Sequence, residues 1–106
     1  MTKTEVTDLY DAILSLGSVP ECVRFFADLC TPAETKSLSD RWLVARLLTE
    51  GVPYRAISLR TGVSTATVTR VARALTYGAQ GYRIALERRP KPRIRKPTVD
   101  RSKPDA

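Results

Sequence analysis

The 106-residue sequence predicts an all-α fold of about six short helices. Apolar residues recur at intervals of three and four positions, which is the spacing of one helix face, and the alternation typical of strands is absent. Serine, threonine, proline and glycine, the residues that begin and end helices, fall between these apolar stripes. Together the two patterns divide the chain into helices joined by short turns.

The first two helices are predicted from their apolar positions and from the residues that separate them, Gly17 and Ser18. The first helix ends at Gly17, and its apolar stripe comprises Val6, Leu9, Tyr10, Ile13 and Leu14. Ser18 followed by Glu21 fits a capping box, with Pro20 in the first turn of the second helix, where its missing N–H costs little. The apolar side chains that this second helix is expected to bury are Val23, Phe25, Phe26 and Leu29.

Proline marks the starts of the next two helices. Thr31, Pro32 and Glu34 begin a longer third helix that stops at Gly51, and Pro53 opens a fourth. The apolar positions of the third helix are Leu38, Trp42, Ala45 and Leu48.

The remaining boundaries come from glycine and hydroxyl residues. Gly62 breaks the fourth helix, and Ser64 or Thr65 caps a fifth. A turn over 78–81, with glycine at both ends, precedes a last helix over 82–89.

The chain is expected to form one helical domain over residues 1–89, followed by a tail over residues 90–106. The tail combines four prolines with six Lys/Arg and has too few apolar side chains for a packed core. We therefore expect it to be disordered and basic. No apolar run is long enough to span a membrane, and the N-terminus lacks the pattern of a signal peptide. A cytoplasmic protein with no membrane partner is predicted.

Several features argue against an enzyme or a metal site. The sequence has no histidine, no paired acidic motif and no glycine-rich phosphate loop. Cys22 and Cys30 would lie about 12 Å apart if one helix ran through both, too far for a disulfide. Two thiols without a histidine also make a poor metal site. The sequence therefore predicts no catalytic residues, no metal and no cofactor.

The net charge of +7 is distributed unevenly along the chain. Residues 1–50 hold five Lys/Arg against eight Asp/Glu, whereas residues 51–86 hold five arginines and no acidic residue. Residues 87–106 hold eight Lys/Arg against three acidic residues. This pattern suggests an acidic scaffold followed by a surface that faces a polyanion. A solvated basic face with a solubilising tail would give the same charges.

The helices also predict an oligomer. Small domains bury a low fraction of their surface, so about six short helices leave a modest core. The apolar faces of the first, second and last helices need more cover than one chain supplies. We therefore expect a homodimer, most simply one with two-fold symmetry.

Residues 54–75 are the most informative segment for function. They predict two short helices hinged at Gly62, where the turn needs a positive φ. Ile57, Val68 and Val71 are expected to face inward, so that the helices pack at a steep angle. This is the pattern of a helix-turn-helix, which presents its second helix to the major groove of DNA.

The side chains of this segment suit DNA. The second helix begins with small residues, so its N-terminal turn can approach base edges and phosphates. Arg55 is positioned to reach a guanine or a phosphate, and Arg70 and Arg73 are expected to neutralise phosphate charge. The predicted DNA-binding residues are Arg55, Ser64, Thr65, Ala66, Thr67, Thr69, Arg70 and Arg73. The alternative is a helical hairpin whose arginines are only solvated.

Several segments together match a known family. They are Thr31-Pro-Ala-Glu34, Arg41-Trp42, Leu47-Leu48-Thr-Glu-Gly51, Tyr54-Arg-Ala-Ile57, Gly62-Val-Ser-Thr-Ala-Thr-Val-Thr-Arg70 and Leu75-Thr-Tyr-Gly-Ala-Gln-Gly-Tyr82. With them the chain resembles the tryptophan repressor (TrpR) superfamily, and more closely its YerC/YecD-type members. The resemblance implies an all-α, intertwined homodimer whose fourth and fifth helices form a DNA-reading head.

The same resemblance implies a pocket for an effector. In the tryptophan repressor a threonine and two arginines help to hold the amino acid, and Thr31, Arg41 and Arg70 stand at the matching positions. Val71, however, stands where the repressor has a glycine that leaves room for the indole, and overpacking there costs about 1–3 kcal/mol. Two further departures are Ala74, in place of a serine, and Cys30, in place of a leucine. We predict that tryptophan is not the corepressor. The two arginines are then either surface or phosphate-facing residues or ligands of an unknown anionic effector.

The leading functional hypothesis is a dimeric, sequence-specific transcriptional regulator that binds double-stranded DNA. Repression by occlusion is favoured, because the sequence offers no further domain to recruit polymerase. The alternative is a non-specific nucleic-acid-binding accessory protein that relies on the basic tail. A module that binds another protein's helix is a further class.

Overall fold

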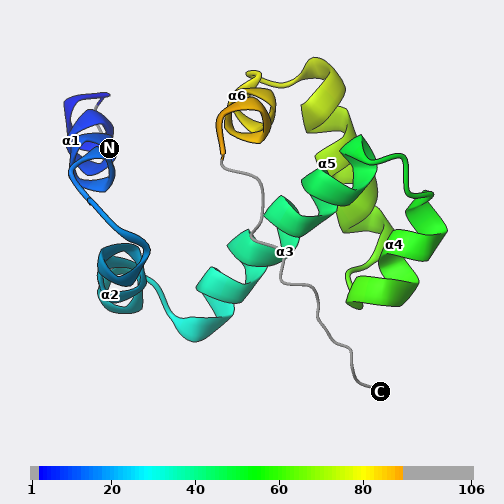
Figure 1. The fold of residues 1–106 in the computed structure, drawn as a ribbon, viewed down its shortest axis with the longest axis horizontal. Helices are drawn as coiled ribbons and strands as arrows, with labels where there is room; N and C mark the ends of the chain where they lie inside the picture. The colour runs from blue at the N-terminus through cyan, green and yellow to red at the C-terminus, as the bar shows by residue number, and fades with distance from the viewer. Residues whose placement is uncertain (1–2, 90–106) are drawn as a thin grey trace.

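The computed structural model describes residues 3–89, which form six α-helices and no strands (Figure 1). The helices are α1 (Lys3–Leu14), α2 (Val19–Leu29), α3 (Pro32–Thr49), α4 (Tyr54–Thr61), α5 (Thr65–Tyr77) and α6 (Gly81–Arg88). The all-α prediction is confirmed, although the last helix begins one residue earlier than expected. The predicted tail over 90–106 lies outside the described residues. None of the described helices combines the length and apolarity that a membrane crossing requires.

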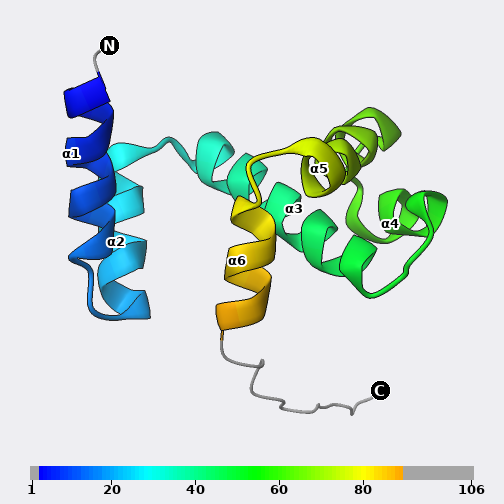
Figure 2. The same ribbon diagram turned by 90° about the horizontal axis from the view of Figure 1, so that it is seen from above.

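The helices are arranged as an arm and a head (Figures 1 and 2). The arm consists of α1 and α2, which run in opposite directions beside the N-terminal end of α3 (Figure 2). The head consists of α3 to α6. There α4 and α5 pack on each other and on α3, and α6 packs on α3 and α5. The head therefore has more neighbouring helices than the arm to cover its apolar surface.

The hydrophobic core lies in the head. Its buried residues are Val44 and Ala45 of α3, Ile57 of α4, Val63 of the following turn, and Val68, Val71 and Leu75 of α5. The predicted inward orientation of Ile57, Val68 and Val71 is confirmed, since none of the three is more than 1% exposed. α6 adds the half-buried Tyr82 and Leu86 to the edge of this core. The core therefore holds α4 and α5 to the long α3.

The arm is open in the single chain. Val23 and Leu29 were expected to be buried, yet they are 63% and 50% exposed. Phe25 and Phe26 are half-buried, with ring centroids 5.6 Å apart. Within residues 3–89, a cavity of about 670 Å³ separates part of this face, including Val23 and Phe26, from α3. The radius of gyration is accordingly 16.1 Å, against about 12–13 Å for a compact domain of this length.

Capping residues explain where α2 and α3 begin. The Thr31 side chain accepts a hydrogen bond from the Glu34 N–H at 3.1 Å, and the Glu34 carboxylate accepts one from the Thr31 N–H at 2.8 Å. This is a complete capping box. At α2, Ser18 accepts from the Glu21 N–H, but the Glu21 carboxylate bonds the N–H of Gly17 at 2.7 Å. The expected reciprocal bond is thus made one residue earlier.

The turn between α5 and α6 is tight and sends the chain back onto the head. A Cβ at Gly78 would overlap the carbonyl of Ala74, so only glycine fits there without a shift. Gln80 adopts a φ of 71°, the left-handed region that few residues other than glycine occupy. These two residues reverse the chain, so that α6 returns to α3 and α5.

Candidate nucleic-acid interface

The turn between α4 and α5 is closed by hydrogen bonds from its own side chains. Gly62 ends α4 with a φ of 77°, and its N–H donates to the Ser58 carbonyl at 2.9 Å. The Ser58 hydroxyl donates to the Val63 carbonyl at 2.6 Å. The Thr61 hydroxyl accepts from the Val63 N–H at 3.1 Å and donates to the Ile57 carbonyl at 2.7 Å. Since Val63 is also buried, this network fixes where α5 begins.

The N-terminus of α5 is capped by Ser64, one of the two residues predicted for this position. Its Oγ accepts a hydrogen bond from the Thr67 N–H at 3.1 Å and donates to the Thr67 hydroxyl, also at 3.1 Å. The first bond of the helical ladder runs from the Val68 N–H to the Ser64 carbonyl. The N–H groups of Thr65 and Ala66 therefore have no partner within the helix and form an anion-binding end.

One face of α5 carries the predicted contact residues. Ala66, Thr69, Arg70 and Arg73 follow the spacing i, i+3, i+4, i+7, which places them on the same side of a helix. All four are exposed, whereas Val68, Val71 and Leu75 on the opposite side are buried. Thr65 is exposed at the start of the helix, and Thr67 is half-buried. We call the four exposed residues with Thr65 the α5 face.

The charge of this region is not neutralised within residues 3–89. The exposed arginines are Arg55 and Arg60 on α4 and Arg70 and Arg73 on α5. None of the four lies within ion-pair distance of a carboxylate in the described part of the chain. Because residues 51–86 contain no acidic side chain, all four positive charges remain available to a polyanion.

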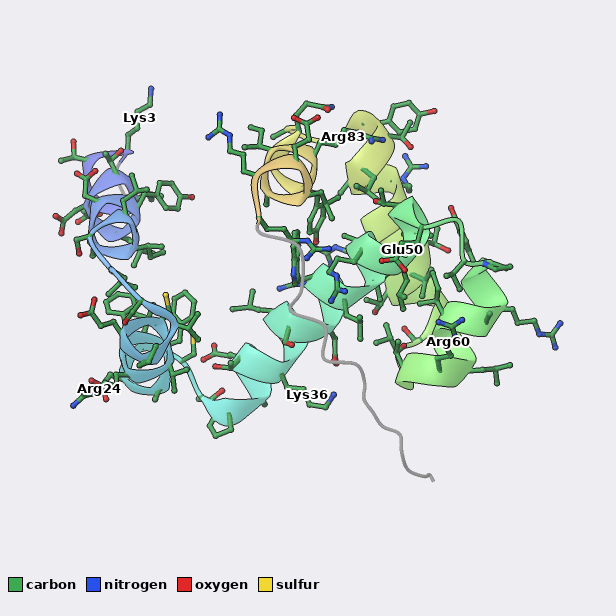
Figure 3. All side chains as sticks on the ribbon, in the orientation of Figure 1. Lys3, Arg24, Lys36, Glu50, Arg60 and Arg83 are labelled. Carbon is green, nitrogen blue, oxygen red and sulfur yellow. The ribbon has the colours of Figure 1, made fainter. Side chains whose placement is uncertain are left out.

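Two arginine contacts were not anticipated from the sequence. Arg83 reaches from α6 toward the end of α5 (Figure 3), where its Nε donates to the Leu75 carbonyl at 3.1 Å. Its guanidinium therefore supplies a hydrogen-bond donor to a carbonyl near the C-terminal end of α5. The Arg73 guanidinium lies over the ring of Tyr77, 5.8 Å from the centroid, which is a cation–π contact one turn along the same helix. The contact of Arg83 with the Leu75 carbonyl follows from no spacing rule. The contact of Arg73 with Tyr77 could have been predicted, because residues four positions apart lie on the same face of a helix.

The predicted effector residues are partly brought together. Arg41, Arg70 and Val71 line one cavity of about 330 Å³ beside the α5 face. The other residues that line it are Leu38, Trp42, Ala74 and Tyr82. Thr31 is not among them in the single chain, where its side chain caps α3. Tyr82 was missed because only the return of α6 brings it to this place.

Within residues 3–89, the two cysteines are not part of a cluster of metal-ligating side chains. Both are free, and both line a larger, mostly apolar cavity between α2 and α3. No group of three or more residues of metal-ligating type occurs within residues 3–89.

Comparisons with known proteins agree with this architecture. Residues 4–90 match the family model described as Trp repressor protein. The chain is 51% identical over 84 residues to YerC of Bacillus subtilis (strain 168), described as an uncharacterized protein, covering 79% of this chain and 81% of YerC. A TrpR-like protein from Eubacterium eligens ATCC 27750 has a similar structure, with a TM-score of 0.79 and 46% identity over 82% of this chain and 90% of that one. A candidate Trp repressor from Staphylococcus aureus has a TM-score of 0.79 and 42% identity over 82% and 87% of the two chains.

Proposed function

Because the chain belongs to the Trp repressor family, we propose that it is a DNA-binding transcriptional regulator that inserts α5 into the major groove. The α5 face carries the proposal. It combines small side chains, two threonine hydroxyls and two unneutralised arginines on the exposed part of a helix whose other side is buried. The closed turn after α4 supports it, because a helix that reads bases needs a fixed position.

We divide the contacts by chemistry. Ala66 and Thr69 are proposed to face base edges, where a methyl suits thymine and a hydroxyl serves as donor or acceptor. Arg70 and Arg73 are proposed to bind phosphates, together with Arg55 at the start of α4. Ser64 and Thr67 bond each other, so we propose that they act mainly by holding the N-terminus of α5 toward the backbone of the DNA.

A homodimer completes the proposal. Large apolar side chains remain exposed on the arm, on α3 and on α6, including Leu14, Val19, Val23, Leu38 and Ile84. A second copy is the proposed cover for these faces. Two α5 helices would then read half-sites about one helical turn apart, and bound protein would repress by occluding the promoter. Because a transcriptional regulator acts where the DNA lies, the proposal includes a cytoplasmic location.

Selection of bound duplexes from a random DNA pool tests the function. The proposal predicts enrichment of one sequence with two-fold symmetry, and sedimentation should give twice the chain mass. Binding without enrichment would favour the non-specific accessory protein, and failure to retain any duplex at low salt would refute DNA binding. Removal of residues 90–106 should leave the enriched sequence unchanged and flatten the salt dependence, by about 0.9 in slope for each phosphate that the tail neutralises in the full-length protein.

A further inference from the structure

Tyr82 of the last helix packs against the core beside the proposed DNA-reading helix. The Tyr82 ring stacks on that of Trp42 in α3, with centroids 6.4 Å apart and planes 23° from parallel. Tyr82 also lines one cavity with Arg70 and Ala74 of α5. The residue therefore stacks on α3 and borders the space between α3 and α5. Ala74 is small, which leaves room for a ring at this point.

A second contact fixes α6 to the end of α5. Arg83, the next residue, donates its Nε–H to the Leu75 carbonyl at 3.1 Å (Figure 3). The turn before α6 holds Gln80 in the left-handed region, and a conformation of that kind persists only where its surroundings impose it. Leu86 packs against the core one turn after Tyr82. α6 is thus attached to both α3 and α5.

These contacts affect the orientation of α5 and therefore of the α5 face. α5 is joined to α4 by a closed turn, and its middle packs on α3 through Val68 and Val71. Its second half borders a cavity, which the stacked aromatic side chains of Trp42 and Tyr82 also line. Without the Tyr82 ring the space between α3 and α5 would widen, and α5 would sample more than one tilt.

We propose that Tyr82 is a positioning residue, an internal aromatic wedge that holds α5 in the orientation needed for specific DNA binding. The head thereby supplies its own aromatic group at the α3–α5 junction. This inference rests on the proposed function, because it concerns the geometry of the same DNA-reading helix.

The test compares Tyr82→Ala with Tyr82→Phe, which keeps the ring and removes only the hydroxyl. Trp42 is the single tryptophan of the chain, so its fluorescence reports on the stack without any DNA. Tyr82→Ala should shift Trp42 emission and weaken binding to the selected duplex about tenfold, as when one-tenth of the molecules remain competent. Tyr82→Phe should bind like the parent protein.

Chemical rescue separates positioning from general stability. Millimolar phenol, which has the shape of the ring that Tyr82→Ala removes, should restore both Trp42 emission and DNA affinity in this variant. If Tyr82→Ala does not fold, Tyr82→Leu is compared with the parent in Trp42 emission and DNA affinity without phenol. The proposal is overturned if the folded variant binds DNA like the parent, if phenol leaves the Trp42 emission of Tyr82→Ala unchanged, or if it restores emission without affinity. If the parent protein binds no duplex, the proposed function fails, while the response of Trp42 in Tyr82→Ala to phenol still measures the wedge.

Discussion

The hydroxyl of Ser58 in α4 donates a hydrogen bond to the main-chain carbonyl of Val63, 2.6 Å away across the turn that leads into α5. Val63 is buried, so its carbonyl has little access to water. The bond therefore satisfies a polar group that the turn would otherwise leave unpaired, and it ties the end of α4 to the start of α5.

Replacing this hydroxyl should weaken the head. Ser58→Ala should lower the free energy of unfolding by about 1–3 kcal/mol, because a part-buried acceptor loses its donor. Ser15→Ala is a matched control, since Ser15 also donates at 2.6 Å, to the Ala12 carbonyl, but at an exposed position where water can replace it. Urea unfolding measures both. Equal losses would show that the turn does not depend on the Ser58 bond.

The turn before α6 predicts opposite effects for two glycines. Gly78→Ala should destabilise the protein by about 1–3 kcal/mol, because the new Cβ overlaps the Ala74 carbonyl and the backbone must move. Gly81→Ala meets no atom within 4 Å and lies at the start of a helix, so it should stabilise by about 0.4–1 kcal/mol. Thermal unfolding of the two variants checks the order. A stable Gly78→Ala protein would contradict the described turn.

The sequence predicted the helices well because their signals are local. Thr31 with Glu34, Ser64 and Gly62 act within a few residues of themselves, and their caps and turn occur where expected. The inward faces of α4 and α5 also follow from spacing. The apolar face of α2 was expected to be buried and is exposed in the single chain, because periodicity shows that a face is apolar but not what covers it.

The contacts of α6 could not be predicted for a related reason. Arg83 and the Leu75 carbonyl, like Tyr82 and Trp42, meet only after the 78–81 turn reverses the chain. From sequence alone Arg83 was another positive charge, and Tyr82 was a residue of the family pattern. The sequence therefore predicted the residues of the α5 face, but it did not predict the contacts of α6 that support this face.

Salt dependence should reveal which arginines contact phosphate. If Arg73 makes one phosphate contact, Arg73→Gln should reduce the slope of log affinity against log salt by about 0.9. Arg24→Gln, which removes an exposed charge on the arm, should leave the slope unchanged. Fluorescence anisotropy with the selected duplex at several salt concentrations measures both slopes. The assignment of Arg73 fails if the two variants cannot be distinguished.

Tryptophan should not bind the cavity between α3 and α5. Val71 is 1% exposed and lines this cavity, and the Tyr82 ring also lines it, so an indole would have to displace packed side chains. Calorimetric titration should give no saturable heat at micromolar concentrations. Stoichiometric micromolar binding would contradict the prediction. Arg41 and Arg70 would then be the first residues to test for contact with the bound tryptophan.

Methylation protection on the selected duplex determines whether the α5 face reads the major groove. Dimethyl sulfate methylates guanine N7, which faces the major groove. A dimer that inserts both α5 helices should protect two clusters of guanine N7 atoms centred about 10 base pairs apart. Unchanged N7 reactivity on fully bound DNA, with protection only at adenine N3 in the minor groove, would show that α5 does not enter the major groove.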